Sequence, residues 1–247
     1  MLLTADRIIH QGYAHSEVGI EINEYGRIAH VGQLAQMGTP DVVLAGKVIL
    51  PGFVNAHSQS LHRLMRGRSQ FLAPQEDAYR TWRDTMYWIC HLLDPQAVFI
   101  AARQTFLEML LSGVTTVGEF HCMHYRPDGS PYDDMHAMAN AVIDAACAVG
   151  IRLSLIRVVS LKGYYKEPPN DAQICFSDPS LDIASDRFSD LVKKLVERAD
   201  PRISWAIGVQ GIEHVPFDAL VGLKNLLGHM PFHMQVAVDR QEINDCE

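Results

Sequence analysis

From residue 114 onward, short apolar segments alternate with longer segments of helical periodicity, and this alternation constrains the fold more than any other feature. The short segments are rich in Val, Ile and Leu, and the longer ones carry apolar residues at intervals of three and four. We expect strands at 114–120, 152–159, 203–209 and 232–238, and helices at 131–149, 188–199 and 217–229. Strands that alternate with helices form right-handed βα units around a parallel sheet. The sequence therefore predicts an α/β protein.

A further apolar segment near 48–57 brings the expected parallel strands to about five, whereas a closed (β/α) barrel needs eight. We therefore expect residues 48–247 to form an incomplete TIM-like (β/α) barrel. An open parallel sheet has unpaired edges, which pair readily with other chains. Either a second copy or another subunit supplies the missing strands, so that the protein is an oligomer, or the open sheet is covered differently.

The first 47 residues lack a helical period and alternate apolar and polar residues over short stretches. Asn23-Glu24-Tyr25-Gly26 has turn chemistry between two such stretches. We expect residues 1–47 to form a small, β-sandwich-like domain without catalytic residues. After residue 63 the chain is polar and loop-like, and two helices are then expected at 77–93 and from Asp94-Pro95 to Ser112-Gly113.

Composition excludes several classes of function. The chain of 247 residues is 48% hydrophobic and 20% charged, with a formal net charge of −8, so it lacks the basic character of a nucleic-acid-binding protein. No apolar run approaches the roughly 20 residues that span a bilayer, and the first residues do not resemble a signal peptide. The five cysteines form no Cys-x-x-Cys pair. We expect a cytoplasmic protein with reduced thiols.

Polar residues stand where the expected strands end, and ligand sites of parallel α/β folds lie at the carboxyl ends of their strands. These residues are His57, His121, Gln210 and Gln235. His57 and Gln59 are two residues apart and share one face of a strand. Two histidines at this spacing would converge on a metal ion, but here the second position is an amide.

Several sequence motifs resemble those of one enzyme family. Residues 51–59, Pro-Gly-Phe-Val-Asn-Ala-His-Ser-Gln, resemble PGxxNxHxH, the first-strand signature of the amidohydrolase superfamily. Further matches lie at Trp82-Arg83, 119–124, 126–132, 164–170 and 233–237. Together they are similar to the formimidoylglutamate deiminase family, zinc hydrolases that break a C–N bond during histidine degradation. The resemblance covers nearly the whole chain but only the N-terminal part of that family.

The resemblance assigns metal-ligand roles to positions that have changed in this chain. His57 matches the family's first zinc ligand, whereas Gln59 and Gln235 stand where the family has its second and third ligand histidines. Val238 matches the acid/base glutamate, and the remaining histidine and aspartate ligands match positions beyond residue 247. An amide oxygen is a much weaker zinc ligand than an imidazole, and valine cannot transfer a proton. We therefore expect no zinc cofactor and no metal-activated water.

Substrate-binding positions implied by the resemblance have changed as well. His62 replaces a glutamine, Cys122 replaces a tyrosine, and the family's His-x-x-Arg reads Gln210 to Glu213. Only Arg83 still matches. Placing Glu213 where an arginine would hold a substrate carboxylate produces a repulsion of roughly 1–4 kcal/mol at a few ångströms, for effective dielectric constants between 80 and 20.

These substitutions favour a non-catalytic relative of the deiminase that binds a ligand, such as a small anion at Arg83, or acts as a partner subunit. Two alternatives stay open. One is a hydrolase or deaminase that holds zinc in a rebuilt site, for example with His57, His62 and His121, or that a partner chain completes. The other is a relic whose fold persists without a selected role. His57 alone can be a remaining ligand or a hydrogen-bonded structural histidine, and Cys122 is a weak candidate nucleophile.

Overall fold

The computed structural model describes all residues except 70–77, 228–229, 239 and 247. The chain divides into two compact units, residues 1–53 and 54–247. The sequence predicts this boundary after residue 47, six residues earlier. Part of the helix expected at 77–93 and the end of the one expected at 217–229 lie outside the described residues. No helix within the described ranges is long and apolar enough to cross a membrane.

The first unit is a small sheet with one short helix. Its strands are β1 (Leu2–His10), β2 (Tyr13–His15), β3 (Val18–Ile22), β4 (Ile28–Gln33) and β5 (Val42–Ile49), and α1 spans Leu34–Met37. The order is β2-β1-β3-β4, and β5 pairs in parallel with β1. The Asn23 side chain accepts hydrogen bonds of 3.0 Å from the amides of Tyr25 and Arg27, which stabilises the expected turn. Ile8 of β1 packs with Val18 and Ile20 of β3 in a small core.

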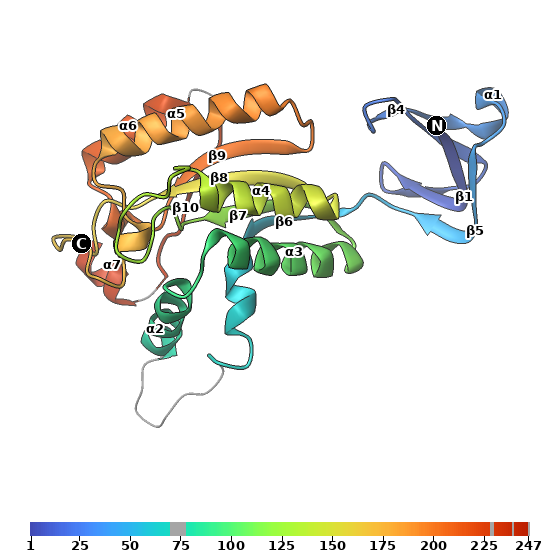
Figure 1. Ribbon diagram of the computed structural model, residues 1–247. Helices are drawn as coiled ribbons and strands as arrows, with labels where there is room; N and C mark the ends of the chain where they lie inside the picture. The colour runs from blue at the N-terminus through green and yellow to red at the C-terminus, as the bar shows by residue number, and fades with distance from the viewer. Residues whose placement is uncertain (70–77, 228–229, 239, 247) are drawn as a thin grey trace. The chain divides into compact units, whose positions relative to one another are not determined.

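The second unit contains a curled sheet of five strands in the order β10-β9-β8-β7-β6. These strands are β6 (Phe53–Ser58), β7 (Val114–His121), β8 (Arg152–Val159), β9 (Ile203–Val209) and β10 (Phe232–Met234). The helices are α2 (Ala78–Cys90), α3 (Pro95–Leu111), α4 (Ala137–Val149), α5 (Leu181–Arg198), α6 (Phe217–Leu227) and α7 (Arg240–Cys246), with short 3-10 helices at Ser60–Met65, Ile174–Phe176 and Ile212–His214. Helices α3 to α6 lie along the outer face of the sheet (Figure 1). This half-barrel confirms the expected α/β fold.

Strands β7, β8 and β9 are nearly continuous runs of buried residues, as expected for a parallel sheet covered on both faces. Two glycines allow neighbouring strands to approach closely. A Cβ atom on Gly118 would lie 2.7 Å from the Ala56 carbonyl oxygen, and one on Gly208 would lie 2.8 Å from the His233 carbonyl oxygen. Any larger residue at either position would push two strands apart at the carboxyl end of the sheet.

Several boundaries differ from the predictions. Helix α4 begins at Ala137 and not at 131, because Asp134 caps a loop through the His136 amide at 3.0 Å. Helix α5 begins at Leu181, seven residues before the predicted start, where the Ser180 hydroxyl accepts the Ile183 amide at 3.2 Å. Strand β10 ends at Met234, and α7 was not predicted.

Candidate functional site

The carboxyl ends of the two edge strands of the curled sheet meet. β6 and β10 are four strand positions apart in the sheet, yet the side-chain amide nitrogen of Gln235, just after β10, lies 3.4 Å from Nε2 of His57, near the end of β6. The His57 ring also packs against Phe120, with 5.0 Å between the ring centroids. The curvature of the sheet therefore brings a predicted metal position on one edge directly against one on the other.

Two more imidazoles lie close to His57. Burial and, next in size, the charge that His57 would carry lower the pKa of His62 to about 4. His233 shows the same two effects, burial first and then His57, and burial also lowers the pKa of His57 itself. All three rings are therefore neutral at pH 7. Sequence reasoning missed His233, although His233 and Gln235 repeat the His-x-Gln spacing of His57 and Gln59.

A cavity of about 50 Å³ lies beside this cluster and is lined by residues from five segments of the chain. It brings together predicted residues from α2, from the loops after β9 and β10, and from the 3-10 helix at 212–214: Arg83, Gln210, Glu213, Gln235 and Val238. Its wall is also aromatic, with Trp82 and three tyrosines. The residues expected to form the site therefore do converge.

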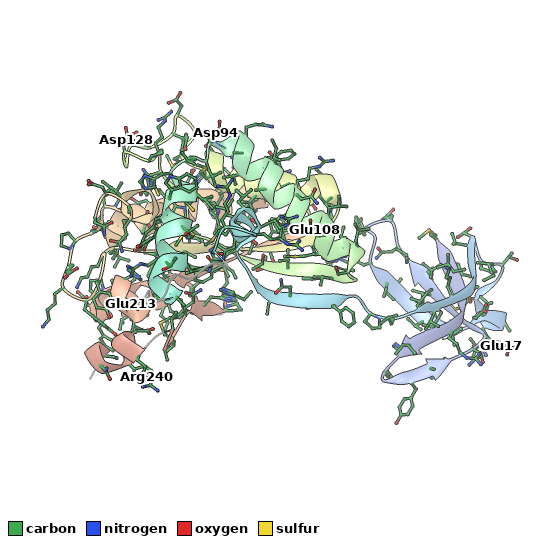
Figure 2. All side chains as sticks on the ribbon, turned by 90° about the horizontal axis from the view of Figure 1, so that it is seen from below. Glu17, Asp94, Glu108, Asp128, Glu213 and Arg240 are labelled. Atoms are coloured by element: carbon green, nitrogen blue, oxygen red, sulfur yellow. The ribbon has the colours of Figure 1, made fainter. Side chains whose placement is uncertain are left out.

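Opposite charges line this cavity. Glu213 is buried, and its carboxylate lies 3.3 Å from Nε2 of His214. Figure 2 shows it on the same side of this unit as Arg240, the first residue of α7. Arg83 is only 3.6 Å from the exposed carboxylate of Asp84, and its buried Nε has no hydrogen-bond partner among the described residues. Arg83, which lines the cavity, therefore keeps one donor without a described hydrogen-bond acceptor.

The other predicted residues line two smaller neighbouring cavities. Gln59, Cys122 and Gln210 line one of about 20 Å³, and Gln59, His62 and Cys122 line one of about 10 Å³. Burial raises the pKa of the Cys122 thiol to about 12. A thiol that stays protonated is a poor nucleophile, which argues against covalent catalysis by Cys122.

Glu119 is a second residue that sequence reasoning did not single out. It lies on β7, is 2% exposed, and its Oε1 accepts the Ser60 amide at 2.6 Å. Burial raises its pKa, and hydrogen bonds from Ser58 and Ser60 oppose that shift. Glu119 therefore ties β7 to the start of the 3-10 helix that follows Gln59.

A family model described as "Amidohydrolase family" matches residues 48–200 of this chain. The chain belongs to the amidohydrolase family. It is 28% identical over 247 residues to the formimidoylglutamate deiminase of Pseudomonas aeruginosa, covering 97% of this chain and 52% of that relative. It is also 28% identical, over 143 residues, to 5-methylthioadenosine/S-adenosylhomocysteine deaminase 2 of Archaeoglobus fulgidus, covering 58% of this chain and 29% of that protein.

Solved amidohydrolase structures share this fold. An amidohydrolase from Brucella melitensis is similar with a TM-score of 0.89 and 26% identity, covering 99% of this chain and 54% of that one. A zinc complex of atrazine chlorohydrolase from Arthrobacter aurescens gives a TM-score of 0.68 at 19% identity, covering 91% of this chain and 50% of that one, and is similar in fold alone. The chain thus spans about half the length of the amidohydrolases that it matches.

The residues present do not fit the zinc that the family resemblance implies. Among the side chains that the structure describes, no three His, Cys, Asp or Glu lie close enough together to hold a metal ion. The three matched ligand positions offer one imidazole, at His57, and two amides, at Gln59 and Gln235. Tetrahedral zinc sites in proteins are built from imidazoles, thiolates and carboxylates, so this donor set is wrong for zinc.

Proposed function

We propose that this amidohydrolase is a non-catalytic member of its family that binds a small ligand at the carboxyl ends of its strands. The observation that carries the proposal is the contact between His57 and Gln235, whose nitrogens are 3.4 Å apart. The Gln235 amide, hydrogen-bonded to His57, occupies the position where the resemblance implies the third metal-binding imidazole. Val238 lines the same cavity and has no proton to transfer.

The charge of the cavity opposes the substrate that the name of the Pseudomonas relative implies. Formimidoylglutamate carries carboxylates, and Glu213 is a buried carboxylate at the position matched to a substrate-binding arginine. Two like charges a few ångströms apart repel by roughly 1–4 kcal/mol, or about 5- to 1,000-fold in affinity. A different ligand is therefore expected, with one small anionic group placed against the available Nε–H of Arg83.

The edges of the sheet support an additional role as a partner subunit. Apolar side chains stand exposed on or next to both edge strands: Val54 on β6 is 69% exposed, and Val236 just after β10 is 58% exposed. Exposed apolar residues beside unpaired strand edges favour pairing with another chain. We expect a second copy or a second subunit to cover them, and light scattering that gives a monomeric mass at micromolar concentration would contradict this expectation.

A hydrolase or deaminase with a different metal site is the second candidate. It is favoured by the proximity of His57 to both His62 and His233, because imidazoles suit a borderline metal ion, but these rings do not themselves form a three-ligand group, so such a site needs further donors. A partner chain that adds a carboxylate could complete such a site. This candidate predicts a bound metal, and the non-catalytic one does not.

Metal content and turnover decide between the two candidates. We expect the purified protein to contain far less than one zinc, iron or manganese per chain by elemental mass spectrometry. We also expect no ammonia release from formimidoylglutamate, with the Pseudomonas deiminase as positive control. About one metal per chain, together with turnover that a chelator abolishes and His57→Ala removes, would replace the proposal by the hydrolase candidate.

A further inference from the structure

A separate small cavity lies at the carboxyl ends of β7 and β8, beside α4 and α5. Its free volume is about 10 Å³, the space of one water molecule or one small ion. Nitrogen-bearing side chains dominate its polar lining: His121, His124, His136, Arg157 and Arg187. No carboxylate from the described residues lines it, and it shares no residue with the larger cavity around Arg83 and Glu213.

The charge of Arg157 is already compensated. Its two terminal nitrogens lie 3.0 and 2.6 Å from the two oxygens of Asp178, which is completely buried and also accepts the Tyr125 hydroxyl at 2.8 Å. Asp178 faces Arg157 and Tyr125 but is not part of the cavity lining. A buried bidentate ion pair of this kind is electrically neutral, so Arg157 does not determine the charge of the cavity.

Two of the three imidazoles also have partners. His124 Nε2 is 2.7 Å from the carbonyl oxygen of Val158, so this nitrogen carries the hydrogen and donates. His136 Nε2 is 2.8 Å from Asp190, a carboxylate that Lys194 also contacts at 3.2 Å. The Nε2 atoms of His124 and His136 are therefore not available to a ligand.

The two remaining groups lack partners. His121 is 4% exposed, and its Nε2 has no hydrogen-bond partner among the residues that the structure describes. The same holds for the buried Nη1 of Arg187, whose guanidinium stacks 4.5 Å from the centroid of the Tyr125 ring and has no described carboxylate within 4.0 Å. Buried polar groups are nearly always hydrogen-bonded, so two unsatisfied nitrogens lining one hole indicate a missing acceptor.

We propose that this cavity binds a small monovalent anion of halide size, held by Arg187 Nη1–H and His121 Nε2–H. The uncompensated guanidinium supplies the positive charge, and the volume excludes phosphate and organic carboxylates. Burial keeps the pKa of His121 well below its ordinary value, so the ring binds as a neutral donor. The anion joins the end of β7, at His121, to α5, at Arg187.

Crystals grown or soaked in sodium bromide test the site directly by anomalous diffraction. We expect a bromide peak within hydrogen-bonding distance of both His121 Nε2 and Arg187 Nη1. Density without an anomalous signal would identify a water molecule and overturn the proposal.

A solution experiment uses thermal unfolding at constant ionic strength in chloride and in gluconate, an anion too large for the cavity. We expect a higher Tm in chloride for the wild type and loss of this difference in Arg187→Gln. Arg198→Gln removes a cation of the same helix that pairs with Asp144 on the surface, and it should keep the chloride effect. Equal Tm values for the wild type in the two salts, or a chloride effect retained in Arg187→Gln, would refute the site.

Discussion

Restoring two imidazoles at the edge-strand contact should create a zinc site, and the geometry allows the effect to be estimated. Two nitrogens bound to one tetrahedral zinc at about 2.05 Å lie about 3.3 Å apart. The side-chain nitrogens of His57 and Gln235 are 3.4 Å apart, so the two side chains already reach the separation of two ligand atoms. The variant Gln59→His/Gln235→His adds the imidazoles that the resemblance implies, next to a His57 that is neutral at pH 7.

The expected gain follows from the number of ligands. Four-ligand structural sites bind zinc with roughly 10–16 kcal/mol, or about 2.5–4 kcal/mol per ligand. Two added imidazoles therefore predict about 5–8 kcal/mol, a roughly 10⁴- to 10⁶-fold increase in affinity. Competition with a chromophoric chelator measures it, and the matched control Gln59→Asn/Gln235→Asn changes the same positions without adding a ligand. If the histidine variant binds zinc within tenfold of this control, the inference that the amides replace ligands is wrong.

Three further predictions concern stability and titration. Arg157→Met leaves the buried Asp178 carboxylate without its cation and should lower the free energy of unfolding by about 3–5 kcal/mol in urea titrations; a loss below about 1 kcal/mol would contradict the role of the pair. His62 should titrate in NMR with a pKa of about 4. Because His62 binds a proton at higher pH in the unfolded chain than in the folded one, the free energy of unfolding should decline as the pH falls from about 6.5 to 4, and less so in His62→Gln. An NMR pKa near 6.5 would rule this out. Ser180→Ala removes the N-cap of α5 and should lower the free energy of unfolding by about 1 kcal/mol. An unchanged urea midpoint would show that the cap is dispensable.

The strands were the most predictable part of the fold. β8 and β9 span the residues that their Val- and Ile-rich runs predicted, because a buried parallel strand must be apolar on both faces. The start of α5 was missed because its first turns are largely polar and the cap at Ser180 was overlooked. α7 was missed because its carboxylate Glu242 bonds to the amides of Ala237 and Val238, a contact that exists only after the chain has turned.

The site was predictable in its members but not in its pairings. The rule that ligands bind at the carboxyl ends of parallel strands selects residues such as Gln210 and Gln235, and both line the cavity. The same rule cannot reveal that His57 touches Gln235, because this contact depends on how strongly the sheet curls. Nor could any pattern in the sequence connect His121 on a strand with Arg187 on a helix that begins sixty residues later.

The bonds made by Glu242 also bear on which side chains position 238 can accept. The buried Glu242 carboxylate accepts the Ala237 amide at 2.8 Å and the Val238 amide at 2.6 Å, so it lies against the backbone of the residue that the resemblance matches to the family's glutamate. The substitution Val238→Glu would add a second carboxylate to the cavity that Glu242 lines, which favours protonation or movement of one of the two. Glu242 therefore disfavours a glutamate at position 238 unless α7 changes as well.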